Sequence, residues 1–136
     1  VTRLAADDLA EIARLQAAMR RRVERGEPYT AEDIGLHRAI LRHADNRLLA
    51  AMLDAVYALA EARLAAPPAD RPALDSARSQ EDLAEHEALT AAVLARDGRL
   101  AQRRLVAHFD TTARRLGFAP PSRALGSPDD GRSSGA

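Results

Sequence analysis

The chain has 136 residues, and its 20 basic side chains, all of them arginine, are balanced by 20 acidic ones. A chain of this length suits one domain. Its zero net charge argues against a nucleic-acid-binding domain, because such domains usually carry an excess of basic residues that neutralises phosphates. The absence of cysteine excludes disulfide scaffolds, thiolate zinc sites and cysteine nucleophiles.

Hydrophobic residues make up 46% of the chain but aromatic residues only 3%, so we expect an aliphatic core. The abundance of alanine and leucine favours helices. No segment approaches the roughly 18 consecutive apolar residues of a membrane span. The N-terminus carries acidic residues where a signal peptide needs an apolar core. We therefore expect a cytoplasmic protein with no membrane partner.

The first predicted helix runs from about Asp7 to Arg25. Its two acidic residues at the start and its arginines at the end complement the helix dipole, and Gly26 and Pro28 end it. Spacings of three and four residues place one apolar stripe on this helix, formed by Leu9, Ile12, Gln16, Met19 and Val23.

Two further helices follow in the first half of the chain. Thr30 is predicted to cap the second helix, with Asp33 three residues later, and this helix is predicted to end near residues 44–45. Asn46 is predicted to cap a third helix that reaches Leu64. The prolines of residues 65–72 predict a loop after it.

The fourth helix is predicted to begin around Ser79, with Asp82 serving as a capping residue in its first turn. A fifth helix follows the break at residues 97–98 and runs to about Leu116. Residues 119–136 are rich in proline, glycine and serine, so we expect a disordered tail after a domain of residues 1–118. No alternating strand pattern occurs, which predicts an all-α antiparallel helical bundle.

Three of the four histidines lie on faces that are predicted to point inward. His86 belongs to the stripe of Leu83, Thr90 and Val93, and His108 to a stripe that also contains Thr112. Asp33 and His37 are one helical turn apart, so a carboxylate and an imidazole can approach the same ion. His43 lies about 120° around the helix from His37 and is predicted to point elsewhere.

Two interpretations of these inward groups remain open at the level of the sequence. A single buried histidine is usually a hydrogen-bonded core residue. Three buried imidazoles and a carboxylate without a shared partner would carry a compounded desolvation cost. A divalent ion removes that cost, and these donor types suit zinc, nickel, manganese or iron.

Several other chemistries are excluded by inspection. No His-Glu-x-x-His helix is present, because position 90 is threonine where a second histidine would be needed after His86. There are no Glu-x-x-His pairs of the di-iron type, no glycine-rich phosphate loop and no Gly-x-Ser-x-Gly elbow. We therefore expect no hydrolase nucleophile and no enzyme activity.

The segment Asp33-Ile-Gly-Leu-His37, followed by Asn46-Arg-Leu-Leu, resembles the Asp-x-x-Phe-His … Asn-x-x-Leu signature of the FCD domain. This is the C-terminal effector domain of FadR-type transcriptional regulators of the GntR family. The later segment from Glu85-His86 through Asp97 to His108 is similar to the second signature of that family. The resemblance covers roughly residues 5 to 118.

The resemblance implies a bundle of about six antiparallel helices around a metal ion, with zinc preferred. It also implies that one aspartate and three histidines hold the metal, which are Asp33, His37, His86 and His108 in this sequence. Leu36 stands where the family has phenylalanine, which changes the packing beside His37 but not its donor atom.

In the family, a winged helix-turn-helix domain and a first effector helix precede the segment that corresponds to residues 7–25. This sequence contains neither, so we expect it not to bind operator DNA by itself and to have one wall of its pocket absent. The resemblance further implies a homodimer and a small carboxylate effector. Thr90 and Thr112, one turn beyond two of the histidines, are candidate donors to that carboxylate.

A hydroxyl bonded back to its own helix is the alternative role for each threonine. A small helical metalloenzyme, or an interaction module with a metal-free polar core, are the alternative functions of the whole chain.

Overall fold

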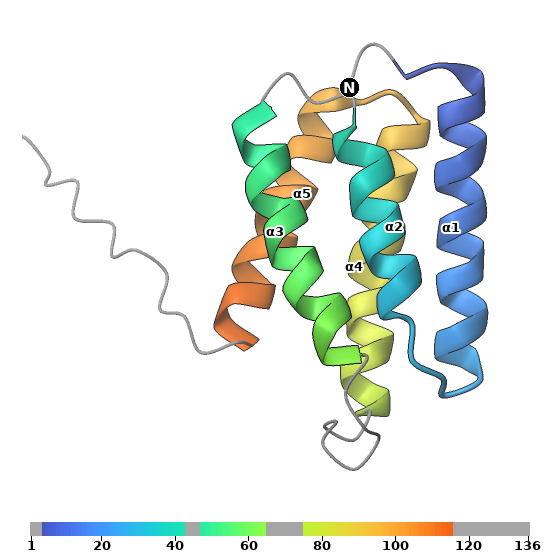
Figure 1. Cartoon of the computed structure of the whole chain (residues 1–136). Coiled ribbons are helices and arrows are strands. Elements are labelled where there is room, and N and C mark those ends of the chain that lie inside the picture. Colours follow the sequence, from blue (N-terminus) through green and yellow to red (C-terminus); the bar gives the residue numbers. More distant parts are fainter. Residues whose placement is uncertain (1–3, 43–46, 65–74, 116–136) are drawn as a thin grey trace, which may run out of the picture.

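The computed structural model describes residues 4–42, 47–64 and 75–115. This part of the chain forms five helices and no strand, as predicted: α1 (Ala6–Glu24), α2 (Thr30–Leu41), α3 (Arg47–Leu64), α4 (Ser76–Leu94) and α5 (Gly98–Arg115). Successive helices run in opposite directions (Figure 1). The all-α bundle is therefore confirmed. The predicted tail of residues 119–136, the loop of residues 65–72, and the positions of His43 and Asn46 lie outside the described residues.

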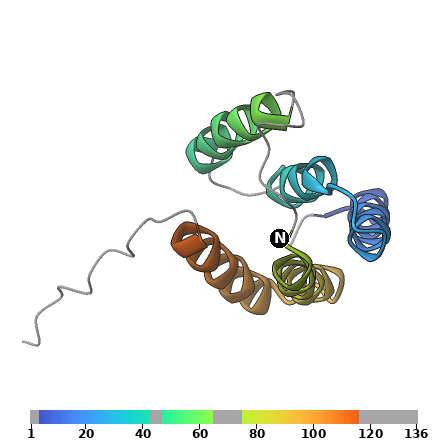
Figure 2. The ribbon, with the colours of Figure 1, turned by 90° about the horizontal axis from the view of Figure 1, so that it is seen from below.

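The helices are arranged as a horseshoe when the bundle is viewed end-on (Figure 2). Going around it, α3 packs against α2, α2 against α1, α1 against α4, and α4 against α5. The two helices at the ends of this row, α3 and α5, therefore face each other across the interior. Side chains that point inward from α2, α3, α4 and α5 can meet there.

An aliphatic core joins α1, α2 and α4. Most of the predicted stripe on α1 is buried, with Ile12 and Met19 fully inaccessible to solvent. Ile12 packs with apolar residues of α2 and α4 such as Leu36, Leu89 and Val93, each with at most 1% of its surface exposed, whereas Met19 packs with Val23 and with Leu83 of α4. Burying one such side chain stabilises the fold by about 1.5–3 kcal/mol, so this core fixes the positions of α2 and α4.

The start of α2 differs from the prediction. Tyr29, not Thr30, occupies the cap position, and its side chain makes no capping hydrogen bond. Thr30 is already helical, because the first main-chain bond of the helix runs from the Asp33 amide to the Tyr29 carbonyl. The predicted capping role of Thr30 is therefore wrong. The Asp33 carboxylate points into the bundle, toward the histidines described below.

The start of α4 was also placed too late by the sequence. Asp75 caps this helix by accepting hydrogen bonds from the amides of Ala77 and Arg78. Ser79 lies in the first turn and its hydroxyl donates to the Asp75 carbonyl. Asp82 is consequently too far along the helix to cap it, and the capping role predicted for it is wrong. The other helix starts and ends lie close to their predicted positions wherever they are described.

In the part of the chain that the structure describes, no helix combines the length and the apolarity required to span a bilayer.

Candidate metal centre

Three helices bring the four predicted donor residues together inside the horseshoe. Asp33 and His37 come from α2, His86 from α4 and His108 from α5. One ligand atom from each lies within 4.8 Å of the ligand atoms of the others. The prediction that the three histidines point inward is confirmed, because His37, His86 and His108 expose only 2%, 0% and 5% of their surface.

The donor atoms converge at short distances. The Nε2 atom of His37 lies 3.2 Å from the Nε2 atoms of both His86 and His108. The Asp33 Oδ1 atom lies 2.9 Å from His86 Nε2 and 3.2 Å from His37 Nε2. In a tetrahedral zinc site with bonds near 2.1 Å, donor atoms are separated by about 3.4 Å. The spacing of this cluster therefore fits a metal ion.

Without a metal, the charges of Asp33 and His86 stabilise each other. Burial opposes a charge on His86, but its hydrogen bond to Asp33 and the charge of that carboxylate outweigh burial and raise the pKa of His86. Burial likewise opposes ionisation of Asp33, yet hydrogen bonds from His37 and His86 hold the pKa of this carboxyl well below its usual range. The carboxylate is thus ionised and faces three imidazole nitrogens, a donor set that could hold a metal ion.

His108 behaves differently from His86. Burial and the repulsion from a positive charge on His86 or His37 lower the pKa of His108, and these effects outweigh its hydrogen bond to Glu85. A neutral imidazole can offer a lone pair to a metal, whereas a protonated one cannot, so a metal would have to displace the proton that Asp33 favours on His86. His108 is therefore available as a neutral donor at neutral pH.

A second acidic group lies behind the histidines, on the side away from the four converging atoms. The Nδ1 atom of His86 is 2.8 Å from the Asp82 carbonyl, and that of His108 is 2.8 Å from Glu85 Oε2. Asp82, Glu85 and His108 could by their spacing hold an ion of their own. The Arg115 guanidinium already lies 3.4 Å from both carboxylates, so part of their negative charge is offset from within the protein.

Two aromatic rings enclose His37. Tyr57 of α3 stacks on it with ring centroids 5.9 Å apart, and Phe109 of α5 stacks on it at 5.6 Å. Burial and the negative charge of Asp33 raise the pKa of the Tyr57 hydroxyl, so this group stays a neutral donor. The aromatic side chains were not identified from the sequence, because they lie on helices whose position relative to His37 no spacing rule reveals.

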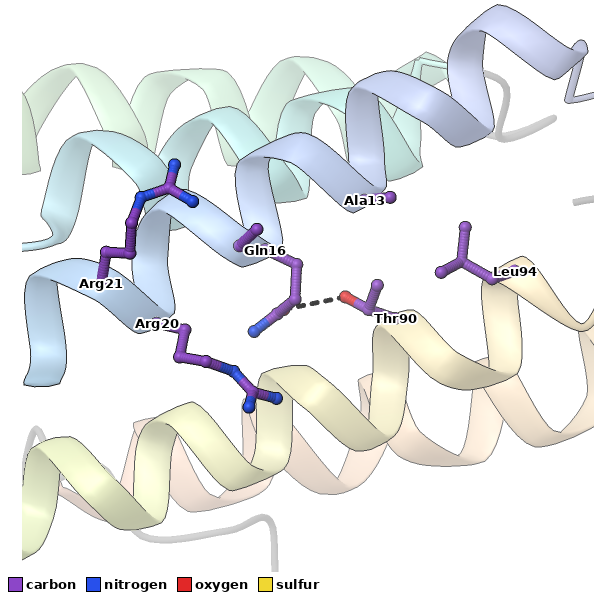
Figure 3. Close-up of a pocket in the computed structure, with 7 residues that line it drawn as sticks. Ala13, Gln16, Arg20, Arg21, Thr90 and Leu94 are labelled. Carbon is purple, nitrogen blue, oxygen red and sulfur yellow. Dashed lines mark hydrogen bonds between the residues drawn. The ribbon is translucent and has the colours of Figure 1, made fainter.

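The two threonines predicted as effector contacts lie in different surroundings. The Thr90 hydroxyl donates to Gln16 Oε1 at 2.9 Å, in a groove between α1 and α4 (Figure 3). Of the described residues that line this groove, none is a donor of the metal centre. Thr112 lies half-buried on α5, one turn beyond His108. The structure thus brings the four donors together but places Thr90 on the α1 side of α4.

A comparison with protein families gives a match to the FCD domain over residues 1–111. The chain belongs to the FCD domain family. FCD domains are the effector-sensing domains of GntR-family transcriptional regulators. The predicted resemblance is therefore confirmed. A search of curated proteins and a search of solved structures each found no match.

Proposed function

We propose that this FCD domain senses a small organic acid through a divalent metal ion bound by Asp33, His37, His86 and His108. The single observation that carries the proposal is the convergence of these four donor atoms within 4.8 Å of one another. Zinc is the preferred ion because it favours nitrogen donors with one carboxylate oxygen; nickel, manganese and iron accept the same set.

The bound ion would supply positive charge in a poorly hydrated interior, which favours a carboxylate ligand over a neutral one. Side chains of the domain would then orient that ligand. The Tyr57 hydroxyl is buried and, within the described residues, has no hydrogen-bond partner, so it can donate to a ligand oxygen. The Thr112 hydroxyl also has no partner among the described residues, whereas Thr90 would first have to leave Gln16.

Effector binding would change the populations of two packing arrangements of the helices. This change would alter the relative positions of the two DNA-binding domains in a homodimer. In this proposal DNA is contacted only by a winged helix domain outside this chain. The zero net charge of this chain agrees with a separate DNA-binding domain, because a domain that contacts DNA usually carries an excess of basic residues.

The experiment is elemental analysis of the purified domain, followed by thermal unfolding of the metal-loaded protein with di- and tricarboxylates. We expect a transition metal in the wild type, its loss in His86→Ala, and a higher unfolding temperature with at least one acid. A wild type that carries no transition metal, and whose stability His86→Ala leaves unchanged, would show a metal-free polar core instead. Chemical turnover of an acid would show a metalloenzyme.

A further inference from the structure

The hydrogen bond between His108 and Glu85 links the candidate metal centre to the surface of the bundle. Glu85 immediately precedes His86 on α4, and its Oε2 atom lies 2.8 Å from Nδ1 of His108 on α5. The His108 side chain is 6% exposed, while the Glu85 side chain is 28% exposed. Glu85 therefore contacts a donor histidine from outside, without belonging to the four converging atoms.

This contact determines which nitrogen of His108 carries the proton. A neutral imidazole has one N–H donor and one lone pair, and an ionised carboxylate only accepts hydrogen bonds. Glu85 therefore requires the proton on Nδ1, which leaves the lone pair on Nε2. Nε2 is the atom that lies 3.2 Å from His37 Nε2, inside the centre.

We propose that Glu85 is a positioning residue of the metal centre: it holds the His108 ring in one tautomer and one orientation, with the Nε2 lone pair directed at the ion. The inference rests on the proposed function, because it assumes that the four donors bind a metal. Such outer partners also raise the donor strength of an imidazole, and losing one typically weakens metal binding about 10–100-fold.

Arg115, at the end of α5, holds Glu85 in place. Its guanidinium lies 3.4 Å from Glu85 Oε1 and 3.4 Å from Asp82 Oδ1. The main-chain carbonyl of Asp82 in turn accepts a hydrogen bond from Nδ1 of His86. One arginine therefore supports the outer acceptors of two donor histidines. His37 lacks this support, because its Nδ1 atom has no partner among the described residues.

The competing explanation is that Glu85 only ties α4 to α5 through Arg115. Glu81 offers a matched control for that role, because it lies one turn earlier on α4 and contacts the same guanidinium at 3.4 Å. No contact between Glu81 and His108 is found among the described residues, and the Glu81 side chain is 71% exposed. Removing either charge should weaken the tie between the helices, but only Glu85 should affect His108.

The test compares the wild type with Glu85→Gln and Glu81→Gln. Zinc affinity is measured by competition with a chromophoric chelator, and the His108 tautomer by long-range proton–nitrogen spectra of the metal-free protein. We expect Glu85→Gln to bind zinc about 10–100-fold more weakly and to lose its exclusive Nδ1–H tautomer. Glu81→Gln should match the wild type in both measurements.

Equal zinc affinities and equal tautomers in the two variants would overturn the inference while leaving the proposed function intact. A wild type that binds no zinc would overturn both. If Glu85→Gln does not fold, Glu85→Asp replaces it: the charge is kept but the carboxylate no longer reaches Nδ1, so the same loss of affinity is expected. Wild-type affinity in Glu85→Asp would then count against a positioning role.

Discussion

His37 and Tyr57 stack face to face, with an angle of 23° between their ring planes, and each ring carries one buried polar atom without a partner in the described part of the chain. Buried polar atoms are nearly always paired, so each of these two atoms has the capacity to bond a water or a bound group. The Nε2 atom of His37 already faces the donor cluster. In the proposed function, the Tyr57 hydroxyl is therefore the group that donates to the effector.

Tyr57→Phe should separate effector binding from metal binding. The substitution removes a buried hydroxyl that has no hydrogen bond to lose, so the stability of the ligand-free protein and its zinc affinity should not fall. The stabilisation by a carboxylate effector should decrease by about 0.5–1.5 kcal/mol, the usual net value of one hydrogen bond. Thermal unfolding with and without the acid measures this. An unchanged response to the acid would show that the hydroxyl does not contact it.

Asp33→Asn should make the stability of the domain insensitive to metal. In the wild type, removing the metal with a chelator should lower the unfolding temperature. A free metal concentration of about 1,000 times Kd raises the free energy of unfolding by about 4 kcal/mol, and the chelator removes this contribution. The variant lacks the anionic donor and should unfold at the same temperature with or without chelator. Asp54→Asn serves as the control, because the Asp54 side chain is 62% exposed and pairs only with Arg38 among the described residues. A chelator response in Asp33→Asn equal to that of Asp54→Asn would contradict the assignment of Asp33.

Thr90→Val should destabilise the metal-free domain by about 1–3 kcal/mol, because the carbonyl oxygen of Gln16 would remain buried without its donor. Thr111→Val is the matched control: the Thr111 hydroxyl donates to its own helix at the Ala107 carbonyl and is exposed. Urea unfolding of both variants gives the comparison. Equal free energies of unfolding in the two variants would show that the bond between α1 and α4 contributes nothing.

Tyr29 should make the domain less stable at high pH. Burial and the nearby charge of Asp82 raise the pKa of Tyr29 to about 12. The folded state thus favours the neutral phenol. The stability that Tyr29 contributes is therefore complete below about pH 10, which is the pKa of tyrosine in an unfolded chain, and it is lost as the pH rises toward 12. Tyr29→Phe should show a smaller loss of stability between pH 10 and 12 when unfolding is followed by circular dichroism. Parallel pH profiles for the two proteins would contradict this prediction.

The sequence predicted the parts of the fold that depend on periodic patterns. The spacing of Ile12, Met19 and Val23 placed them on the buried face of α1, and the four-residue interval between Asp33 and His37 placed both on one face of α2. These predictions succeeded because a helix repeats every 3.6 residues whatever surrounds it.

Helix starts and contacts between helices could not be predicted in this way. Several polar residues near a helix start can act as caps, and in the structure Asp75 rather than Ser79 accepts the amide hydrogen bonds. The contacts of Glu85 with His108 and of Tyr57 with His37 join residues about 20 apart in sequence, on different helices. Burial and distance reveal such pairs, but no local pattern in the sequence does.

The four donors are separated by intervals of 4, 49 and 22 residues along the chain. They join α2 to α5, which are not neighbours in the horseshoe. The packing contacts between these two helices otherwise run through α1 and α4. An ion held by all four would therefore tie the two halves of the row together in the folded state, and its binding free energy would add to the stability of the fold because the site does not exist in the unfolded chain. Its loss would divide the domain into smaller units that open separately, and amide protons of α5 would then exchange before those of α1.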